Sequence, residues 1–486
     1  MVVLAVELGE VTTEVGAHIT HDLLAVVEDG VGEDSPPIFG DEHQVGVAVP
    51  NSMAATAYRV IRGHDTNATL GSVLKRYRYR AYPDGSQQKA LARVFGCVRV
   101  VFNDVIAARR DQHRAGAPFE SASVLQSRLV TAAKSTPERA WLAEVSATPL
   151  QQAVRDADRA YRNFFDSVTG KRKGRKMGAP RFKKRTNRQS ARFTRQCGFT
   201  VCETSHGVAH LRVPKVGWVR YAASRPLPSD PSSVTVICEP DGRYYVSFVV
   251  DEPATPAGAP TRVAGVDVGL THLAAITYSD GTREKITNPR WARTRARKLA
   301  RAQRSLARKQ KGSNNRDKAR RRVAVEHRKV RDARLDHQHK LARRLVCENQ
   351  AVVIEGLNTA GLGRTRLARS IHDAAWAILL RLITEKATTA GAEIIVADRF
   401  MPSSQTCAVC GHHDGRKPLT IRHWTCIHCG TRLDRDWNAA TNLMMLAAGL
   451  AESENACGDS VRRTLACAES KKQEPAEQTV PTGTAA

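Results

Sequence analysis

The chain has 486 residues, enough for two to four domains, and carries 75 Lys and Arg against 48 Asp and Glu. The formal net charge of +27 predicts a polyanionic partner, and nucleic acid is the usual one. A basic protein of membrane surfaces is the alternative, but no apolar run approaches the roughly 18 residues that a spanning helix needs. The first residues also lack the positive segment of a signal peptide. Eleven cysteines, an odd number, argue against a disulfide framework, so we expect a cytoplasmic, nucleoid-associated protein without membrane contact.

Both ends of the chain differ in composition from its middle. Residues 1–50 contain no Lys or Arg and ten acidic residues. This segment is either an acidic arm that competes with nucleic acid for the basic surface, or a stretch upstream of the true start at Met53 or Val73. We favour the upstream stretch. Residues 1–70 are therefore predicted to be an N-terminal extension, disordered or outside the true start, and residues 451–486 a disordered tail.

Residues 71–255 are predicted to form a β-barrel-like domain with a helical insertion at about 86–170. Alternating aromatic and basic residues indicate a strand at Tyr77–Tyr82, and Pro83-Asp84-Gly85 makes a turn into an amphipathic helix from Ser86. Helical spacing continues at Phe95–Gln112 and at Leu150–Phe165. β-rich runs follow at Ser233–Cys238 and Tyr244–Val250. The Pro- and Ala-rich residues 252–259 are predicted to be a linker.

A basic segment follows the predicted insertion. Residues 171–195 hold twelve Lys and Arg and no acid. Such a run is usually only solvated, but Phe182 and Phe193 are interleaved with its charges. Interleaving favours a nucleic-acid groove, because cations hold phosphates while aromatic rings stack on bases or sugars. We therefore predict nucleic-acid contacts in this segment at Lys183, Lys184 and Arg185.

Three acidic residues on separate predicted elements are candidates for catalysis. Asp267 lies inside an apolar strand, Glu355 ends another one, and Asp436 heads a predicted helix from Asn438. Each has a structural alternative, since Asp436 alone would pass as a helix cap and Glu355 as an ion-pair partner. Together they favour a site for one or two Mg²⁺ ions, with Mn²⁺ as a substitute, because a buried carboxylate needs a cation and converging carboxylates hold such ions.

The region between Asp267 and Glu355 is strongly basic. Residues 290–344 hold twenty-two Lys and Arg against four acids, and their spacing predicts a long helical hairpin. A solvated hairpin is the alternative, but its position in the chain favours phosphate contacts beside the site, at Arg320, Arg321 and Arg322. With a helix over 370–390 and a strand over 393–397, the element order is that of a ribonuclease-H-like α/β domain, with a first part at 256–400 and a last segment at 434–450.

Two Cys-x-x-Cys pairs lie between these two parts, within residues 401–433. Cys407, Cys410, Cys426 and Cys429 have the spacing of a zinc ribbon, and four thiolates match the closed shell that structural Zn²⁺ prefers. The alternative is four free thiols in loops, which rarely show this spacing by chance. We therefore predict a structural Zn²⁺ site inserted in the nuclease domain.

From Arg76 to Leu450 the chain resembles the TnpB (OrfB) proteins of bacterial insertion sequences, RNA-guided nucleases related to type V CRISPR effectors. The motifs that carry the resemblance include Gly265-Val-Asp-Val-Gly269, Ile354-Glu-Gly-Leu-Asn358, Pro402-Ser-Ser-Gln-Thr-Cys407 and Asp434-Arg-Asp-Trp-Asn-Ala-Ala-Thr-Asn442. The resemblance implies a RuvC-like DNA endonuclease with Asp267, Glu355 and Asp436 as metal ligands. It also implies that the β-barrel-like domain is a wedge domain and that its helical insertion serves recognition. It also implies a guide RNA from the element and a double-stranded DNA target as partners. Members of this family are also called transposases.

Rival functions remain open from the sequence. A guide-dependent repressor without cleavage would be expected to lack one of the three acids, and all are present. A transposase that joins strands itself would need a Tyr nucleophile with His-rich ligands, and no such cluster lies near any Tyr. A simple zinc-ribbon scaffold would not need Asp267 in a buried strand. We expect Asp434 to be structural, pairing or capping near Arg435.

Overall fold

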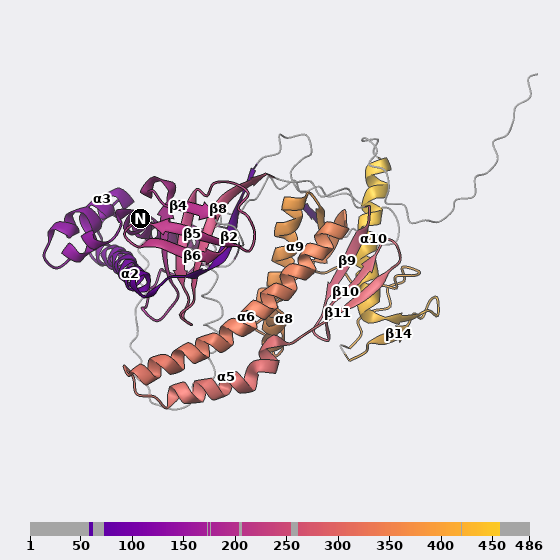
Figure 1. Cartoon of the computed structure of the whole chain (residues 1–486). Helices are drawn as coiled ribbons and strands as arrows, with labels where there is room; N and C mark the ends of the chain where they lie inside the picture. The colour runs from indigo at the N-terminus through magenta and orange to yellow at the C-terminus, as the bar shows by residue number, and fades with distance from the viewer. Residues whose placement is uncertain are drawn as a thin grey trace, which may run out of the picture. The chain divides into compact units, whose positions relative to one another are not determined.

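The computed structural model describes residues 58–61, 72–172, 174, 176–203, 207–253, 261–418 and 420–456. Most of the predicted N-terminal extension, residues 254–259 of the predicted linker and the predicted tail beyond residue 456 lie outside the described residues. The described chain forms a seven-stranded sheet, a six-stranded sheet and a two-stranded hairpin, with helices against the two larger sheets (Figure 1).

The seven-stranded sheet is antiparallel throughout and is curved into a half-barrel. Its strand order is β3-β7-β8-β2-β6-β5-β4. The strands are β2 (Ser72–Tyr82), β3 (Gln189–Thr194), β4 (Thr200–Glu203), β5 (Val208–Val213), β6 (Gly217–Ala222), β7 (Ser233–Cys238) and β8 (Tyr244–Pro253). β8 continues into the predicted linker because it pairs with β2 residue for residue, from Ala81 opposite Tyr244 to Ser72 opposite Pro253.

Helices pack against this sheet and share one hydrophobic core with it. They are α2 (Gly85–Arg114), α3 (Ala122–Gln126), short π and 3₁₀ turns at Ser127–Thr131, Ala132–Ser135 and Ala140–Glu144, and α4 (Ala147–Val168). The two helical patterns predicted from Ser86 and at 95–112 are one continuous helix. Asp84 caps α2, because its side chain accepts a hydrogen bond from the Gln87 backbone and its own backbone N–H donates one to the Gln87 side chain.

The six-stranded sheet has the order β1-β13-β12-β9-β10-β11. Its strands are β1 (Tyr58–Ile61), β9 (Val263–Val268), β10 (His272–Tyr278), β11 (Arg283–Thr287), β12 (Ala351–Glu355) and β13 (Glu393–Ala397). β12 runs parallel to β9 and β13, and the other pairs are antiparallel. β1 differs from prediction, because these four residues of the predicted extension pair with β13 at the edge of the sheet.

Helices cover both faces of this sheet. They are α5 (Trp291–Ala307), α6 (Asn314–Glu348), α7 (Thr359–Leu362), α8 (Ala368–Ala374), α9 (Trp376–Ala390) and α10 (Arg435–Ala456). Leucines of α6 and α9 pack on the face that bears Ala264 and Val266, whereas Leu443 and Met444 of α10 pack on the opposite face with Val263. α10, drawn in yellow, lies beside β9 and β10 in Figure 1. It extends six residues into the predicted tail.

The single helix predicted over 370–390 is broken at Ala375. This residue has a left-handed backbone, with φ of 52°, and it separates α8 from α9. Buried Gln338 of α6 donates hydrogen bonds to the carbonyls of Ala374 (2.8 Å) and Ala375 (3.1 Å). The break is therefore stabilised by a side chain on another element, which local spacing could not indicate.

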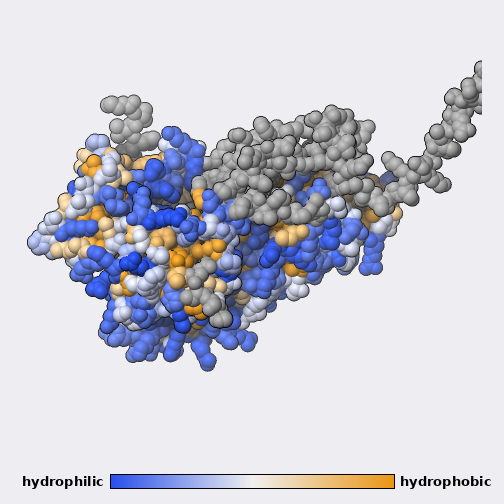
Figure 2. Space-filling model, turned by 45° about the horizontal axis from the view of Figure 1, so that its top comes forward, coloured by the Kyte–Doolittle hydropathy of each residue, from blue (hydrophilic) through white to orange (hydrophobic). Residues whose placement is uncertain are grey.

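The surface agrees with the basic, polar composition. Most of the described surface seen in Figure 2 is hydrophilic, with small apolar patches between. Among the described helices, none combines the length and apolarity needed to cross a membrane.

Candidate metal centre and nucleic-acid interface

Asp267 and Glu355 lie on neighbouring parallel strands and on the same face of the sheet. The register pairs Ile354 with Val266, so the next residue of each strand is one of the two acids. Because side chains alternate along a strand, Asp267 shares its face with Val263, and Glu355 shares its face with Val353. Val263 and Val353 both pack against α10. The two carboxylates therefore face the helix whose first turn contains Asp436.

Gly265 brings α10 against this face. A Cβ atom built at Gly265 would lie 2.1 Å from the carbonyl oxygen of Ala440 and 2.5 Å from the backbone nitrogen of Met444. Real Cβ atoms do not approach backbone this closely, so only glycine allows the helix to lie here. Gly265 thus fixes the distance between β9, which carries Asp267, and α10, which carries Asp436.

The acids influence one another electrostatically. Burial raises the pKa of Asp267 well above its usual range, and the negative charges of Glu355 and Asp436 raise it further, while Arg435 opposes the shift. Burial also raises the pKa of Glu355, against a hydrogen bond of 2.9 Å that the Ser403 hydroxyl donates to its Oε1. Neighbouring carboxylates in a desolvated site repel one another when both are ionised, which costs free energy. A divalent cation bound between them would offset that repulsion.

Asp434 has the structural role that the sequence predicts. Its Oδ1 accepts hydrogen bonds from the backbone nitrogens of Asp436 (3.1 Å) and Trp437 (3.0 Å), so it caps α10. Its Oδ2 lies 2.6 Å from Lys285 Nζ. Burial acts to raise the pKa of Asp434, but the hydrogen bonds from Lys285 and Trp437 lower it overall. The helix begins at Arg435, so Asp436 lies in the first turn and is not the cap.

Three basic side chains that the sequence analysis did not identify surround Asp436. Arg422 Nη1 lies 3.6 Å from its Oδ1, while His272 Nδ1 and Lys285 Nζ lie 3.9 Å and 4.0 Å from its Oδ2. They come from the β14–β15 hairpin region, β10 and β11. No local pattern distinguishes them from ordinary surface residues, and only the tertiary fold brings them to the carboxylate.

The four cysteines form a compact group next to this site. Their sulfur atoms all lie within 4.8 Å of one another, with 3.7 Å between Cys407 and Cys429 and 3.7 Å between Cys410 and Cys426. A tetrahedral Zn²⁺ with bonds of about 2.3 Å would separate its sulfurs by about 3.8 Å, so the group fits this ion.

This cysteine cluster adjoins the hairpin of β14 (His423–Thr425) and β15 (Arg432–Asp434), which leads directly into α10. Among the described residues, the four cysteines are the one group of three or more candidate ligands close enough together to hold a metal ion, and Asp267, Glu355 and Asp436 do not form such a group.

The predicted basic hairpin is formed by α5 and α6, but several of its arginines form ion pairs with acidic residues of other elements. Arg328 lies 2.5 Å from Asp241 at the β7–β8 turn, Arg334 lies 3.1 Å from Asp373, and Arg344 lies 2.6 Å from Glu284. These arginines hold elements together. Of the predicted phosphate contacts, Arg320 pairs with Asp317 (2.6 Å), whereas Arg321 and Arg322 are exposed and have no ion pair within the described chain.

The second predicted basic segment is tethered to α2. The Lys183 backbone and the Asn103 side chain exchange two hydrogen bonds, and Lys183 Nζ lies 3.7 Å from the centroid of the Phe102 ring. Lys184 and Arg185 are exposed. Phe193 was predicted to line a groove, but it is fully buried, because it faces the core from β3. Only Phe182, 46% exposed, remains available for stacking.

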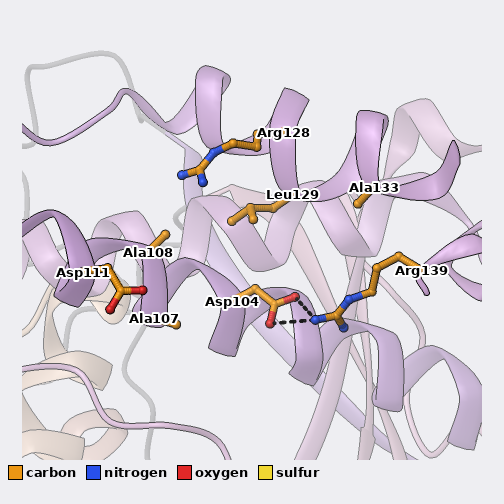
Figure 3. A pocket seen from close by; sticks show the side chains of 8 residues that line it. All are labelled: Asp104, Ala107, Ala108, Asp111, Arg128, Leu129, Ala133 and Arg139. Carbon is orange, nitrogen blue, oxygen red and sulfur yellow. Dashed lines mark hydrogen bonds and ion pairs between the residues drawn. The ribbon is translucent and has the colours of Figure 1, made fainter. Parts of the chain in front are cut away.

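A hollow of about 370 Å³ lies in the helical insertion, and none of the predicted site residues lines it. Figure 3 shows Asp104 of α2 paired with Arg139 across its floor, with Arg128 and Asp111 at its sides. It contains no residue that the carboxylate or cysteine groups use.

Profiles of three families match the chain. The family described as "Probable transposase" (OrfB, IS605) matches residues 246–366, "Cas12f1-like, TNB domain" matches 376–443, and "Helix-turn-helix domain" matches 72–117. The last description does not fit the structure of its span, because the described residues there form strand β2 and one continuous helix, α2.

Two relatives cover most of the chain. A Streptomyces pristinaespiralis protein named "Putative RNA-guided DNA endonuclease" is 43% identical over 81% of this chain and 93% of its own length. A protein of Escherichia coli K12 with the same name and the suffix InsQ is 31% identical over 83% of this chain and 98% of its own length. The chain therefore belongs to the TnpB (OrfB) family of transposase-associated proteins.

The fold has a counterpart among solved structures. The cryo-EM structure of a Cas12f1–sgRNA–target DNA complex matches with a TM-score of 0.50 at 13% identity, over 77% of this chain and 99% of that one. At this identity the match concerns the fold alone, and it agrees with a mixed α/β protein containing a half-barrel.

Proposed function

We propose that the chain is an RNA-guided, metal-dependent DNA endonuclease with a RuvC-like site. The observation that carries the proposal is the placement of Asp267 and Glu355 on adjacent strands, facing the first turn of α10 that carries Asp436. The strand order supports it as well, because β11-β10-β9-β12-β13 is the order 3-2-1-4-5 of a ribonuclease-H-like domain with its first three strands antiparallel. The names of the relatives supply guided DNA cleavage as the activity.

In this proposal the three carboxylates would hold Mg²⁺, which suits a hard oxygen donor set, with Mn²⁺ as a substitute. Bound there, a pair of such ions supplies an activated water and stabilises the leaving oxygen of a phosphodiester. Asp434 and Lys285 fix the start of α10 and so the position of Asp436. Arg422, half exposed beside Asp436, offers a cation to an incoming phosphate.

The remaining parts have supporting roles. The exposed arginines of α6 and the 183–185 segment would bind the phosphate backbone of a guide RNA–DNA heteroduplex with little sequence preference, while base pairing selects the double-stranded DNA target. The four cysteines would hold a structural Zn²⁺ that stabilises the hairpin leading into α10.

The test uses protein purified with RNA from its own locus and a plasmid carrying the guide-matched target. Wild-type protein should cut the plasmid in Mg²⁺ and leave it intact in EDTA. Asp267→Ala and Glu355→Gln should bind the target but not cut it. Glu385→Gln, which removes an exposed acid that pairs with Arg381 on α9, serves as the matched control and should cut normally. Tight binding without cutting by the wild type would instead support a guided repressor.

A further inference from the structure

We propose that Ser403 is a positioning residue that fixes the Glu355 carboxylate for metal binding, and that Asn438 and Asn442 hold Ser403 in place. This inference rests on the proposed function. It concerns a loop between β13 and the cysteines that contributes no ligand of its own. The loop contacts Glu355, the helix α10 and the start of the cysteine cluster.

The first contact is the hydrogen bond from Ser403 to Glu355. Ser403 is 6% exposed, and its hydroxyl lies 2.9 Å from Glu355 Oε1. A hydroxyl donor occupies one lone pair of that oxygen and restricts rotation of the carboxylate, so the other oxygen is presented in a fixed direction. Partners of this kind orient metal ligands, and their loss typically lowers metal affinity or activity about 10- to 100-fold.

The second contact fixes Ser403 itself. Asn438 and Asn442 are almost fully buried and lie one turn apart on α10. The side-chain nitrogen of each donates to the carbonyls of both Ser403 and Thr406, at 3.2 and 2.7 Å for Asn438 and at 2.7 and 2.8 Å for Asn442. The two amides thus hold both ends of a four-residue turn. The position of this turn is therefore fixed relative to α10.

The third contact joins the turn to the cysteines. Asn438 Oδ1 accepts a hydrogen bond of 2.9 Å from the Ala408 backbone, between the first two cysteines, and Thr406 directly precedes Cys407. Asp436 lies two residues before Asn438 on the same helix. One helix therefore carries Asp436, anchors the start of the cysteine cluster and holds the serine that orients Glu355.

The neighbouring serine provides a matched control. Ser404 lies on the same turn, but its side chain makes no hydrogen bond within the described chain. Ser404→Ala removes the same atom from the same loop without touching Glu355. Ser403→Cys keeps the shape of the side chain and weakens the donor, so it should give an intermediate effect if the hydrogen bond matters.

The experiment measures Mn²⁺ binding to guide-loaded protein by electron paramagnetic resonance, with zinc content and single-turnover cleavage measured in parallel. Ser403→Ala should weaken Mn²⁺ binding about 10- to 100-fold. Raised Mn²⁺ should restore much of its cleavage, and its zinc content should be unchanged, which shows that the loop is intact. Ser404→Ala should match the wild type.

Glu355→Gln distinguishes a failure of the positioning role of Ser403 from a failure of the proposed function. If Glu355→Gln weakens Mn²⁺ binding but Ser403→Ala does not, the positioning role is wrong and the proposed function stands. If Glu355→Gln leaves both Mn²⁺ binding and cleavage unchanged, the proposed function itself fails.

Discussion

The close approach of α10 to β9 provides a quantitative test of how the site is built. Gly265→Ala would place a methyl group 2.1 Å and 2.5 Å from two backbone atoms of α10, whereas ordinary contacts begin near 3.4 Å. Backbone atoms cannot rotate away as side chains do, so the helix must move by roughly 1 Å. Overpacking of this kind costs about 1–3 kcal/mol. A displacement of about 1 Å at a catalytic group can reduce the rate about 100-fold.

Gly449→Ala is the control on the same helix. A Cβ atom at Gly449 has no neighbour within 4 Å, so this change adds no clash. Because alanine is favoured over glycine inside a helix, it should leave stability unchanged or raise it by about 0.5–1 kcal/mol. Both variants would be measured by thermal melting and by guided plasmid cleavage. Gly265→Ala with wild-type stability and cleavage would show that α10 does not lie against β9 as described.

Three further predictions concern zinc, nucleic acid and pH. Cys426→Ser should release the zinc and lower the melting temperature, measured by metal analysis and calorimetry, while Cys238→Ser should keep the zinc content; equal zinc in both would contradict the ligand assignment. Neutralising the arginines at 320–322 should weaken binding to unrelated DNA about equally and flatten its salt dependence, and an effect confined to one sequence would count against phosphate contacts. Burial lowers the pKa of His327 below the ordinary value of 6.5. Just below pH 6.5 this histidine therefore binds a proton in the unfolded chain but stays neutral in the folded one. Stability should therefore fall as pH drops below 6.5, and His327→Gln should reduce that fall in pH-dependent denaturation, whereas an unchanged slope would exclude the histidine as its cause.

Sequence patterns predicted the elements that are determined locally. The strands expected at 233–238 and 393–397 have those bounds as β7 and β13, and the strand expected to end at Glu355 does so as β12, because β-branched and apolar runs bounded by turn residues leave few alternatives. Asp267 and Glu355 attracted attention because a carboxylate in or at the end of an apolar strand is costly without a partner, and Asp436 because it precedes a predicted helix; their role as metal ligands stays a prediction. The cysteine spacing likewise predicted a cluster that the structure contains.

The features that could not be predicted depend on distant residues. Ser403 contacts Glu355 across 48 positions, and Lys285 contacts Asp434 across 149. The break at Ala375 depends on Gln338 of another helix. The prediction that Phe193 lines a groove was wrong, because the alternation of side chains along β3 places this ring in the core although basic residues flank it in the sequence.

The most direct test of the central claim is the position of Mn²⁺ in crystals of the guide-loaded protein, located by anomalous diffraction. The proposal predicts manganese bound among the carboxylate oxygens of Asp267, Glu355 and Asp436. Manganese bound only elsewhere, with these three carboxylates separated in the guide-loaded state, would contradict it.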